Sequence, residues 1–180
     1  KIIEVLHNKK ISIDNLYFVA SSNSAGSTLK FGDKEIKVEN LENFDFSKVN
    51  ISFFSAGKTI SEKYVPLAAK HSVVIDNSSF FRMDPDVPLI VPQVNKDHLK
   101  NIKKNIIANP NCSTAQLVIV LKSLNDNFKI KRIVISTYQS TSGAGKKPMD
   151  ELIDQTKSIL NNKSFEVKNF TKQIAFNAIP

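Results

Sequence analysis

The sequence predicts an α/β fold with a largely parallel sheet. Short apolar runs typical of buried strands alternate along the chain with segments whose apolar residues recur at helical spacing. The 180 residues are 41% hydrophobic, so the chain can bury the core of one large or two small domains, and this composition excludes a disordered protein.

The N-terminal half alternates helix and strand signals. Residues 1–10 have the spacing of an amphipathic helix, and the apolar run at 16–20 (LYFVA) predicts a buried strand before a loop of small residues at 21–27. A hairpin turning at Gly32-Asp33 is expected over residues 29–38. Later segments predict strands at 51–55, 72–75 and 104–108 and a helix at 60–70, which Pro66 should kink or divide.

The C-terminal half continues the alternation. Pro85, Pro88 and Pro92 predict that residues 82–94 are extended or turning and not helical. A turn at 109–112 then leads into a helix at 113–124. The remaining segments predict a long strand at 130–138, a Gly-rich turn at 142–145, a helix at 148–160 and the start of a strand at 173–176.

Composition narrows the function classes. The net charge of +8 comes almost entirely from scattered lysines, since Arg82 and Arg132 are the only arginines. Scattered lysines indicate a solvated surface, or steering of an anionic substrate, and no nucleic-acid motif accompanies them. The single cysteine excludes an internal disulfide and a Cys-rich zinc site, so no metal is expected. Without a membrane-length apolar run or a signal peptide, a soluble cytoplasmic protein is expected.

Cys112 is the candidate nucleophile. It is predicted to lie where a buried strand ends and a helix begins, with Ser113 and Thr114 as early-helix or capping residues. The N–H groups and partial positive charge of a helix N-terminus favour the thiolate and can hold an oxyanion. The alternative is an inert cysteine that only packs, but its neighbours in Asn-Cys-Ser-Thr are polar, which disfavours that interpretation.

Eight short motifs follow one another along the chain, and the string around Cys112 is the most informative. They are SAG (24–26), FSAG (54–57), DNSS (76–79), FRMDPDVPL (81–89), NPNCSTAQL (109–117), TYQ (137–139), SGAGKK (142–147) and FNAIP (176–180). Each motif alone is moderately specific, whereas their order is very specific. From about residue 18 to residue 180, the chain resembles the aspartate-semialdehyde dehydrogenase family.

The resemblance implies a Rossmann-like dinucleotide-binding domain over residues 1–111, followed by the start of an α+β catalytic and dimerisation domain over residues 112–180. The first strand and the Gly-rich phosphate loop of such a domain are expected before residue 1. The catalytic histidine and the arginine that binds the substrate carboxylate are expected beyond residue 180. The chain is therefore expected to be an internal piece of a protein that forms a homodimer.

The implied reaction is the reductive dephosphorylation of L-4-aspartyl phosphate. The Cys112 thiolate would attack the acyl carbon, phosphate would leave, and NADPH would reduce the resulting thioester to aspartate semialdehyde. This chemistry belongs to the biosynthesis of lysine through diaminopimelate, and of threonine, methionine and isoleucine. A related alternative is N-acetyl-gamma-glutamyl-phosphate reductase, which shares the cysteine and the fold. A non-catalytic fragment is the alternative of another class.

By resemblance, four side chains serve the substrate. Cys112 is the nucleophile, and Gln139 orients the substrate beside it, because an amide donates and accepts hydrogen bonds without titrating. Arg82 and Asn111 hold the phosphate, for which a planar guanidinium is well suited.

The resemblance also implies the cofactor contacts. Ser21 and Ser24 lie where such folds bind the adenosine ribose, and NADP is the favoured cofactor although Asn23 replaces an arginine that is common in the family. The remaining implied cofactor contacts are Gly57, Asn77, Gly143 and Gly145. His7, His71 and His98 fall on no catalytic motif and are interpreted as structural or surface residues.

Overall fold

The computed structural model describes residues 2–180 and divides the chain into two compact units, Lys1–Lys129 and Ile130–Pro180. We call these the first and the second unit. The predicted boundary between a nucleotide-binding and a catalytic domain, after residue 111, falls inside the first unit and stays a prediction. No helix within residues 2–180 is long and apolar enough to cross a membrane.

The first sheet of the first unit has the strand order β1-β3-β2 and is preceded by helix α1 (Ile2–Asn8). Strand β1 (Phe18–Ala20) pairs parallel with β3 (Lys34–Asn40), and β2 (Thr28–Phe31) pairs antiparallel with β3. The hairpin turns at Gly32 as predicted. The helix predicted over residues 1–10 is confirmed over α1, and Lys1 lies outside the described residues. The strand predicted at 16–20 is found as β1, but all three residues of β1 are partly exposed, so the strand is not fully buried as predicted.

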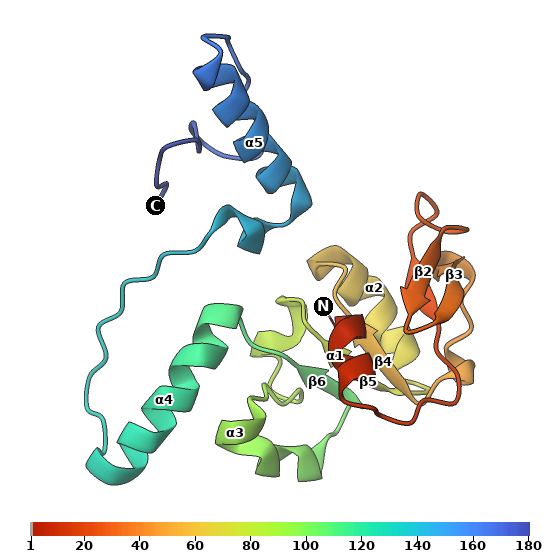
Figure 1. Cartoon of the computed structure of the whole chain (residues 1–180). Coiled ribbons are helices and arrows are strands. Elements are labelled where there is room, and N and C mark those ends of the chain that lie inside the picture. The colour runs from red at the N-terminus through yellow and green to blue at the C-terminus, as the bar shows by residue number, and fades with distance from the viewer. Residues whose placement is uncertain (1) are drawn as a thin grey trace. The chain divides into compact units, whose positions relative to one another are not determined.

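The second sheet carries the core. Strands β4 (Ile51–Phe54), β5 (Val73–Asp76) and β6 (Ile106–Ala108) are all parallel, in the order β4-β5-β6 (Figure 1). The apolar runs of β5 and β6 suit strands that are covered on both faces, as parallel strands usually are, whereas Ile51 and Phe53 of β4 are exposed. Phe54 is in register with Asp76, and Asp76 with Ala108, so the carboxyl ends of the three strands are level.

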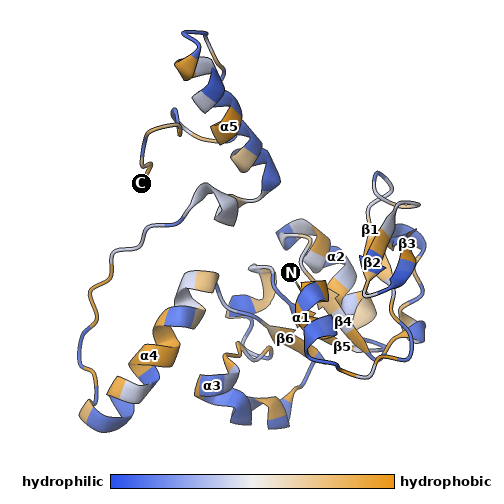
Figure 2. Cartoon of the chain, viewed as in Figure 1, coloured by the Kyte–Doolittle hydropathy of each residue, from blue (hydrophilic) through white to orange (hydrophobic). Residues whose placement is uncertain are grey.

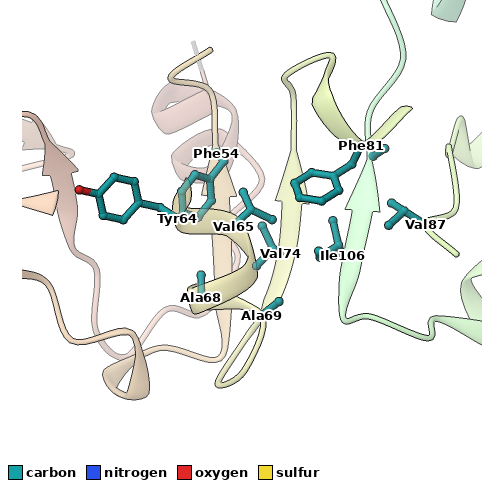
Figure 3. Packing of buried hydrophobic residues seen from close by; sticks show 10 residues of the cluster. Phe54, Tyr64, Val65, Ala68, Ala69, Val74, Phe81, Val87 and Ile106 are labelled. Carbon is teal, nitrogen blue, oxygen red and sulfur yellow. The ribbon is translucent and has the colours of Figure 1, made fainter. Parts of the chain in front are cut away.

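Helix α2 (Lys58–Ala68) connects β4 to β5 and packs against the sheet. Its buried residues Ser61, Tyr64, Val65 and Ala68 recur at helical spacing, and Val65 and Ala68 are fully buried. Tyr64, Val65 and Ala68 form one cluster with Phe54, Val74 and Ile106 from the strands (Figure 3). The expected division at Pro66 is wrong, since α2 runs through Pro66 and ends two residues later. The proline removes only one hydrogen bond near the end of the helix.

A segment of short turns links β5 to β6. It contains the 3₁₀ turn η3 (Phe80–Met83), the one-turn helix α3 (Pro92–Asn95) and the 3₁₀ turn η4 (Lys96–Asn101). Two further 3₁₀ turns, η1 (Leu41–Asn43) and η2 (Phe46–Lys48), lie between β3 and β4. The prediction that residues 82–94 are mostly extended or turning and not helical is confirmed over residues 84–91 and is wrong at 92–94, which lie in α3. Pro92 is accepted because it is the first residue of α3, where no partner is needed for the missing N–H.

Helix α4 (Cys112–Phe128) follows β6 and is longer than the predicted 113–124. Hydrophobic residues lie along it (Figure 2). Ile119, Val120, Leu124 and Phe128 are exposed among the residues that the structure describes.

The second unit contains the 3₁₀ turn η5 (Thr141–Ala144) and helix α5 (Lys146–Leu160), which confirm the predicted Gly-rich turn and helix. The strands predicted at 130–138 and 173–176 are wrong. Both segments lack the ladder pairing that defines a strand within the described residues, and the N–H groups of Ile174 and Ala175 instead donate to Oε1 of Gln155 in α5.

Candidate active site

Three turns follow the level ends of β4, β5 and β6. They carry Gly57, Asn77 and the segment from Asn109 to Cys112. The N–H of Asn77 donates to the carbonyl of Phe54 and that of Asn109 to the carbonyl of Asp76, both at 2.8 Å, so the ladder holds the start of each turn. Ligands of open parallel sheets bind at this carboxyl edge.

Two asparagine side chains connect the turns. Nδ2 of Asn109 donates to Oδ1 of Asn77 at 2.6 Å, and Nδ2 of Asn77 donates to Oγ of Ser55 at 3.5 Å. A chain of side-chain contacts thus crosses the edge of the sheet from the end of β4 to the end of β6. The sequence analysis did not predict Asn109 as a site residue. The one feature of the sequence that could have indicated it is its place in the string NPNC, three residues before Cys112.

Arg82 spans the same two turns from η3. Its Nε donates to the carbonyl of Asn109 at 3.0 Å and its Nη2 to the carbonyl of Asn77 at 3.2 Å. The guanidinium has five N–H donors, so three remain without a hydrogen bond to the described part of the chain. The predicted phosphate contact is untested, and the structure adds a second role, which is to join the two turns.

Asp76 organises the turn after β5. Its carboxylate is fully buried and accepts hydrogen bonds from Oγ of Ser61 at 2.9 Å, from the N–H of Ser78 at 2.9 Å and from Oγ of Ser78 at 2.7 Å. Ser61 belongs to α2, so these bonds tie the helix to the end of β5. A buried carboxylate needs such donors. The acidic residue at the end of an apolar strand was the signal in the sequence.

Cys112 is the first residue of α4 and is exposed, as the interpretation of a reactive cysteine requires. The cap of the helix is Asn111 and not Ser113 or Thr114. Oδ1 of Asn111 accepts from the N–H of Ser113 at 2.9 Å and from that of Thr114 at 3.4 Å. Those two N–H groups are therefore occupied by the cap, and the expectation that the N-terminus of this helix holds an oxyanion stays a prediction.

The predicted cofactor contacts of the first unit fall in two places. Gly57 is the N-cap of α2, with φ of 90°, a conformation that favours glycine, and a Cβ there would meet nothing within 4 Å. Ser21 and Ser24 lie in the exposed loop after β1, on the other sheet, where the carbonyl of Ser21 accepts the N–H of Ser24 at 2.9 Å. Their roles stay predictions.

In the second unit, Gln139 and Gly143 lie together. A Cβ on Gly143 would stand 2.6 Å from Cδ of Gln139, so the glutamine side chain lies directly over this glycine of η5. Gly145 is the N-cap of α5, with φ of 100°. The expectation that Gln139 ends a strand is wrong, because residues 130–138 form no strand in the described part of the chain. Gln139 belongs to the second unit and Cys112 to the first.

The acidic residues of the FRMDPDVPL motif are structural in this fold. The hydrogen bond from Lys104 and then that from the N–H of Asp86 hold the pKa of Asp84 below its ordinary value, and the same bond raises the pKa of Lys104. Asp86 is paired with Lys103 at 3.0 Å. Residues 2–180 contain no group of three or more His, Cys, Asp or Glu side chains that could hold a metal ion.

A parallel sheet whose level strand ends border a helix that begins with an exposed cysteine is the arrangement of an α/β nucleotide-binding domain with a nucleophile beside it. The chain belongs to the semialdehyde dehydrogenase family. Residues 1–102 match the family described as "Semialdehyde dehydrogenase, NAD binding domain", and residues 121–180 match "Semialdehyde dehydrogenase, dimerisation domain". The predicted family and fold class are confirmed.

Known relatives agree with this assignment. The chain is 50% identical over 182 residues to an aspartate-semialdehyde dehydrogenase of Rickettsia bellii, covering 99% of this chain and 53% of the relative. A crystal structure of aspartate semialdehyde dehydrogenase II complexed with ASA from Vibrio cholerae has a TM-score of 0.94 at 47% identity, covering 98% of this chain and 53% of that one. The chain thus spans about half the length of these relatives.

A more distant structural relative is a crystal structure of aspartate semialdehyde dehydrogenase with NADP from Candida albicans. It has a TM-score of 0.56 at 28% identity, and the match covers 71% of this chain and 44% of that chain.

Proposed function

We propose that this chain supplies the nucleotide-binding region and the nucleophile of an NADPH-dependent aspartate-semialdehyde dehydrogenase. The observation that carries the proposal is the exposed Cys112 at the first position of α4, beside the level ends of three parallel strands. The relatives named above bear the same enzyme name at about half identity. In this proposal, residues 1–111 bind the nucleotide and residues 112–180 begin the catalytic and dimerisation domain.

The role of Cys112 follows from thiol chemistry. Its thiolate forms a bond to the acyl carbon of L-4-aspartyl phosphate, and phosphate leaves with the electron pair of the carbon–oxygen bond. The acyl group is then held as a thioester at a fixed position. NADPH, when bound, supplies the hydride for reduction to the semialdehyde, after which the Cys112 sulfur is released.

The phosphate contacts use donors that the fold leaves available. Because Oδ1 of Asn111 is held by the helix N–H groups, its amide NH2 faces away from them and can donate to a phosphate oxygen. Arg82 keeps three N–H donors beyond its two backbone bonds. Both side chains flank the turn that leads into Cys112. In the second unit, Gln139 orients the substrate.

The residues of the first unit fit a dinucleotide. Gly57 leaves open space where any other residue would place a Cβ, and it stands at the start of α2, where unpaired N–H groups favour phosphate. Asn77 completes this edge, and Ser21 and Ser24 offer hydroxyls to the adenosine ribose. Gly143 and Gly145 contribute backbone from the second unit. NADP is supported by the family's nucleotide-binding domain and by the NADP-bound relative.

The assembly and setting follow from the same proposal. The match of residues 121–180 to a dimerisation domain supports a homodimer, which sedimentation of the full polypeptide would measure. The proposed activity places the protein in the cytoplasmic synthesis of lysine, through diaminopimelate, and of threonine, methionine and isoleucine.

Replacement of Cys112 by serine tests the proposal. The full polypeptide is assayed for phosphate-dependent reduction of NADP with aspartate semialdehyde, and Cys112→Ser is expected to lower kcat by about a thousandfold or more, because a hydroxyl is a far weaker nucleophile. Asn127→Ala, at the far end of α4, serves as the control and should keep its activity. Substantial turnover in Cys112→Ser would reject the proposal. If the wild type reacted faster with N-acetylglutamyl semialdehyde than with aspartate semialdehyde, the proposed substrate would be wrong and the related reductase activity would take its place.

A further inference from the structure

Asn109 makes hydrogen bonds in three directions. Its N–H donates to the carbonyl of Asp76 at 2.8 Å, its carbonyl accepts from Nε of Arg82 at 3.0 Å, and its amide donates to Oδ1 of Asn77 at 2.6 Å. Two of these bonds use the backbone and would survive a change of side chain. The bond to Asn77 is the one that requires an amide at position 109.

The side chain of Asn109 is close in sequence to the nucleophile. Pro110 fixes one backbone dihedral of the short link, and Asn111 fixes the next point by capping α4. Little freedom therefore remains between Asn109 and Cys112. Any displacement of Asn109 relative to the sheet is passed on to the first residue of the helix.

The other end of the bond lies on the turn after β5. Asn77 is bound by its N–H to Phe54, by its carbonyl to Arg82 and by its side chain to Ser55 and Asn109. The buried Asp76 holds the same turn from inside through Ser61 and Ser78. The Asn77 turn is thus a rigid reference point on the edge where the nucleotide is proposed to bind.

We propose that Asn109 is a positioning residue, whose amide joins the turn that leads to Cys112 to the turn that carries Asn77. The bond fixes the nucleophile relative to the edge of the sheet where the nucleotide is proposed to bind. This inference rests on the proposed function for its catalytic consequence. This role requires no contact between Asn109 and a reactant. It acts through Asn77 and through the backbone that leads to Cys112.

A double-mutant cycle in the full polypeptide tests the bond. Asn77→Ala, Asn109→Ala and the double variant are compared by kcat/KM with NADP and aspartate semialdehyde. If the two amides act through one bond, the product of the single effects should exceed the double effect by roughly twofold to tenfold, the range for one neutral hydrogen bond. We expect kcat to fall and KM for NADP to rise in Asn109→Ala. Additive effects would overturn the inference.

A charge-matched pair gives a second test. Both variants introduce the same carboxylate. Asn77→Asp keeps the oxygen that accepts the hydrogen bond from Asn109, whereas Asn109→Asp loses the NH2 group that donates it. Asn77→Asp should therefore stay closer to the wild-type kcat than Asn109→Asp by roughly twofold to tenfold. Equal losses would overturn the inference. If Asn109→Ala fails to fold, as judged by circular dichroism, this isosteric pair alone decides.

Alkylation of Cys112 separates this inference from the proposed function. The rate constant for iodoacetamide, followed on the Cys112 peptide by mass spectrometry, needs neither substrate nor cofactor. The alkylation rate constants of the same four proteins are compared, and Asn127→Ala, the control on α4, should react at the wild-type rate. Non-additive effects on the alkylation rate support the positioning role even if the wild type has no dehydrogenase activity. Additive alkylation rates together with normal wild-type turnover would reject the positioning role and leave the proposed function standing.

Discussion

At the scale of single residues, Arg82 shows what sequence and structure each contribute. It is one of two arginines in a lysine-rich chain, and the resemblance to the family predicts that it binds phosphate. The structure gives a further reason for arginine, since Nε and Nη2 bind the carbonyls of Asn109 and Asn77. These contacts could not be predicted, because they depend on the register that levels β5 and β6.

Arg82→Lys should separate charge from geometry. A lysine keeps the positive charge but has no planar fork to bind two carbonyls and a phosphate together. We expect kcat/KM to fall by about tenfold or more and the thermal midpoint to fall by a few degrees. Arg132→Lys, at an exposed position of the second unit, is the matched control. Unchanged activity and midpoint in Arg82→Lys would contradict both roles of the guanidinium.

At the scale of elements, the N-terminus of α4 combines a cap with a proposed phosphate contact in Asn111. Asn111→Ala removes the cap and should destabilise the protein by about 1 kcal/mol. Asn111→Asp keeps an oxygen for the N–H groups of Ser113 and Thr114, so its stability should stay near that of the wild type. It loses the NH2 donor and adds a negative charge, so KM for phosphate should rise. The test compares urea unfolding with phosphate kinetics, and equal kinetics in Asn111→Asp would argue against phosphate binding by Asn111.

Helix α5 holds its neighbouring segment through Glu151. Burial of this carboxylate tends to raise its pKa, but hydrogen bonds from the N–H groups of Lys168 and Asn169, from the Asn169 amide and from Gln155 outweigh burial and leave the pKa below its ordinary value of 4.5. The carboxylate thus satisfies backbone N–H groups of a segment that forms neither helix nor strand.

The lowered pKa of Glu151 predicts acid sensitivity. Its stabilising contribution is fully present above the ordinary pKa of 4.5 and is lost as the pH falls through the lower folded value. Glu151→Gln should therefore unfold at a lower temperature than the wild type at pH 7, and the difference should shrink towards pH 3. Glu166→Gln, which removes an exposed partner of the Lys168 side chain, is the control and should show little effect. A pH-independent difference for Glu151→Gln would contradict the role of its charge.

Local patterns predicted most elements, and their failures share one cause. The apolar runs of β4, β5 and β6 and the spacing of α2 and α5 are properties of short segments, and these elements were predicted within a few residues. The segment at 130–138 has the same apolar pattern, but a strand also needs a paired neighbour, which no pattern within the segment can supply. The cap at Asn111 was missed for a related reason, because Ser113 and Thr114 are equally good capping residues by type.

At the scale of the whole molecule, the two units differ in how they are held together. Every residue of the hydrophobic core cluster lies in the first unit, with Val65 and Val74 fully buried (Figure 3). Among the described residues of the second unit, the buried ones are Glu151, Gln155 and Ala175. The first unit is thus stabilised mainly by apolar burial and the second mainly by polar side chains that bind backbone.

Hydrogen exchange of the 180-residue chain should reflect this difference. Opening of β5, β6 and α2 exposes the core cluster, whereas opening of α5 breaks only the contacts of Glu151 and Gln155, so it costs less free energy. Amides of β5 and α2 should therefore exchange at least about tenfold more slowly than those in the middle of α5, as measured by mass spectrometry of peptides. Equal protection in α5 would mean that polar side-chain contacts stabilise the second unit as strongly as apolar packing stabilises the first.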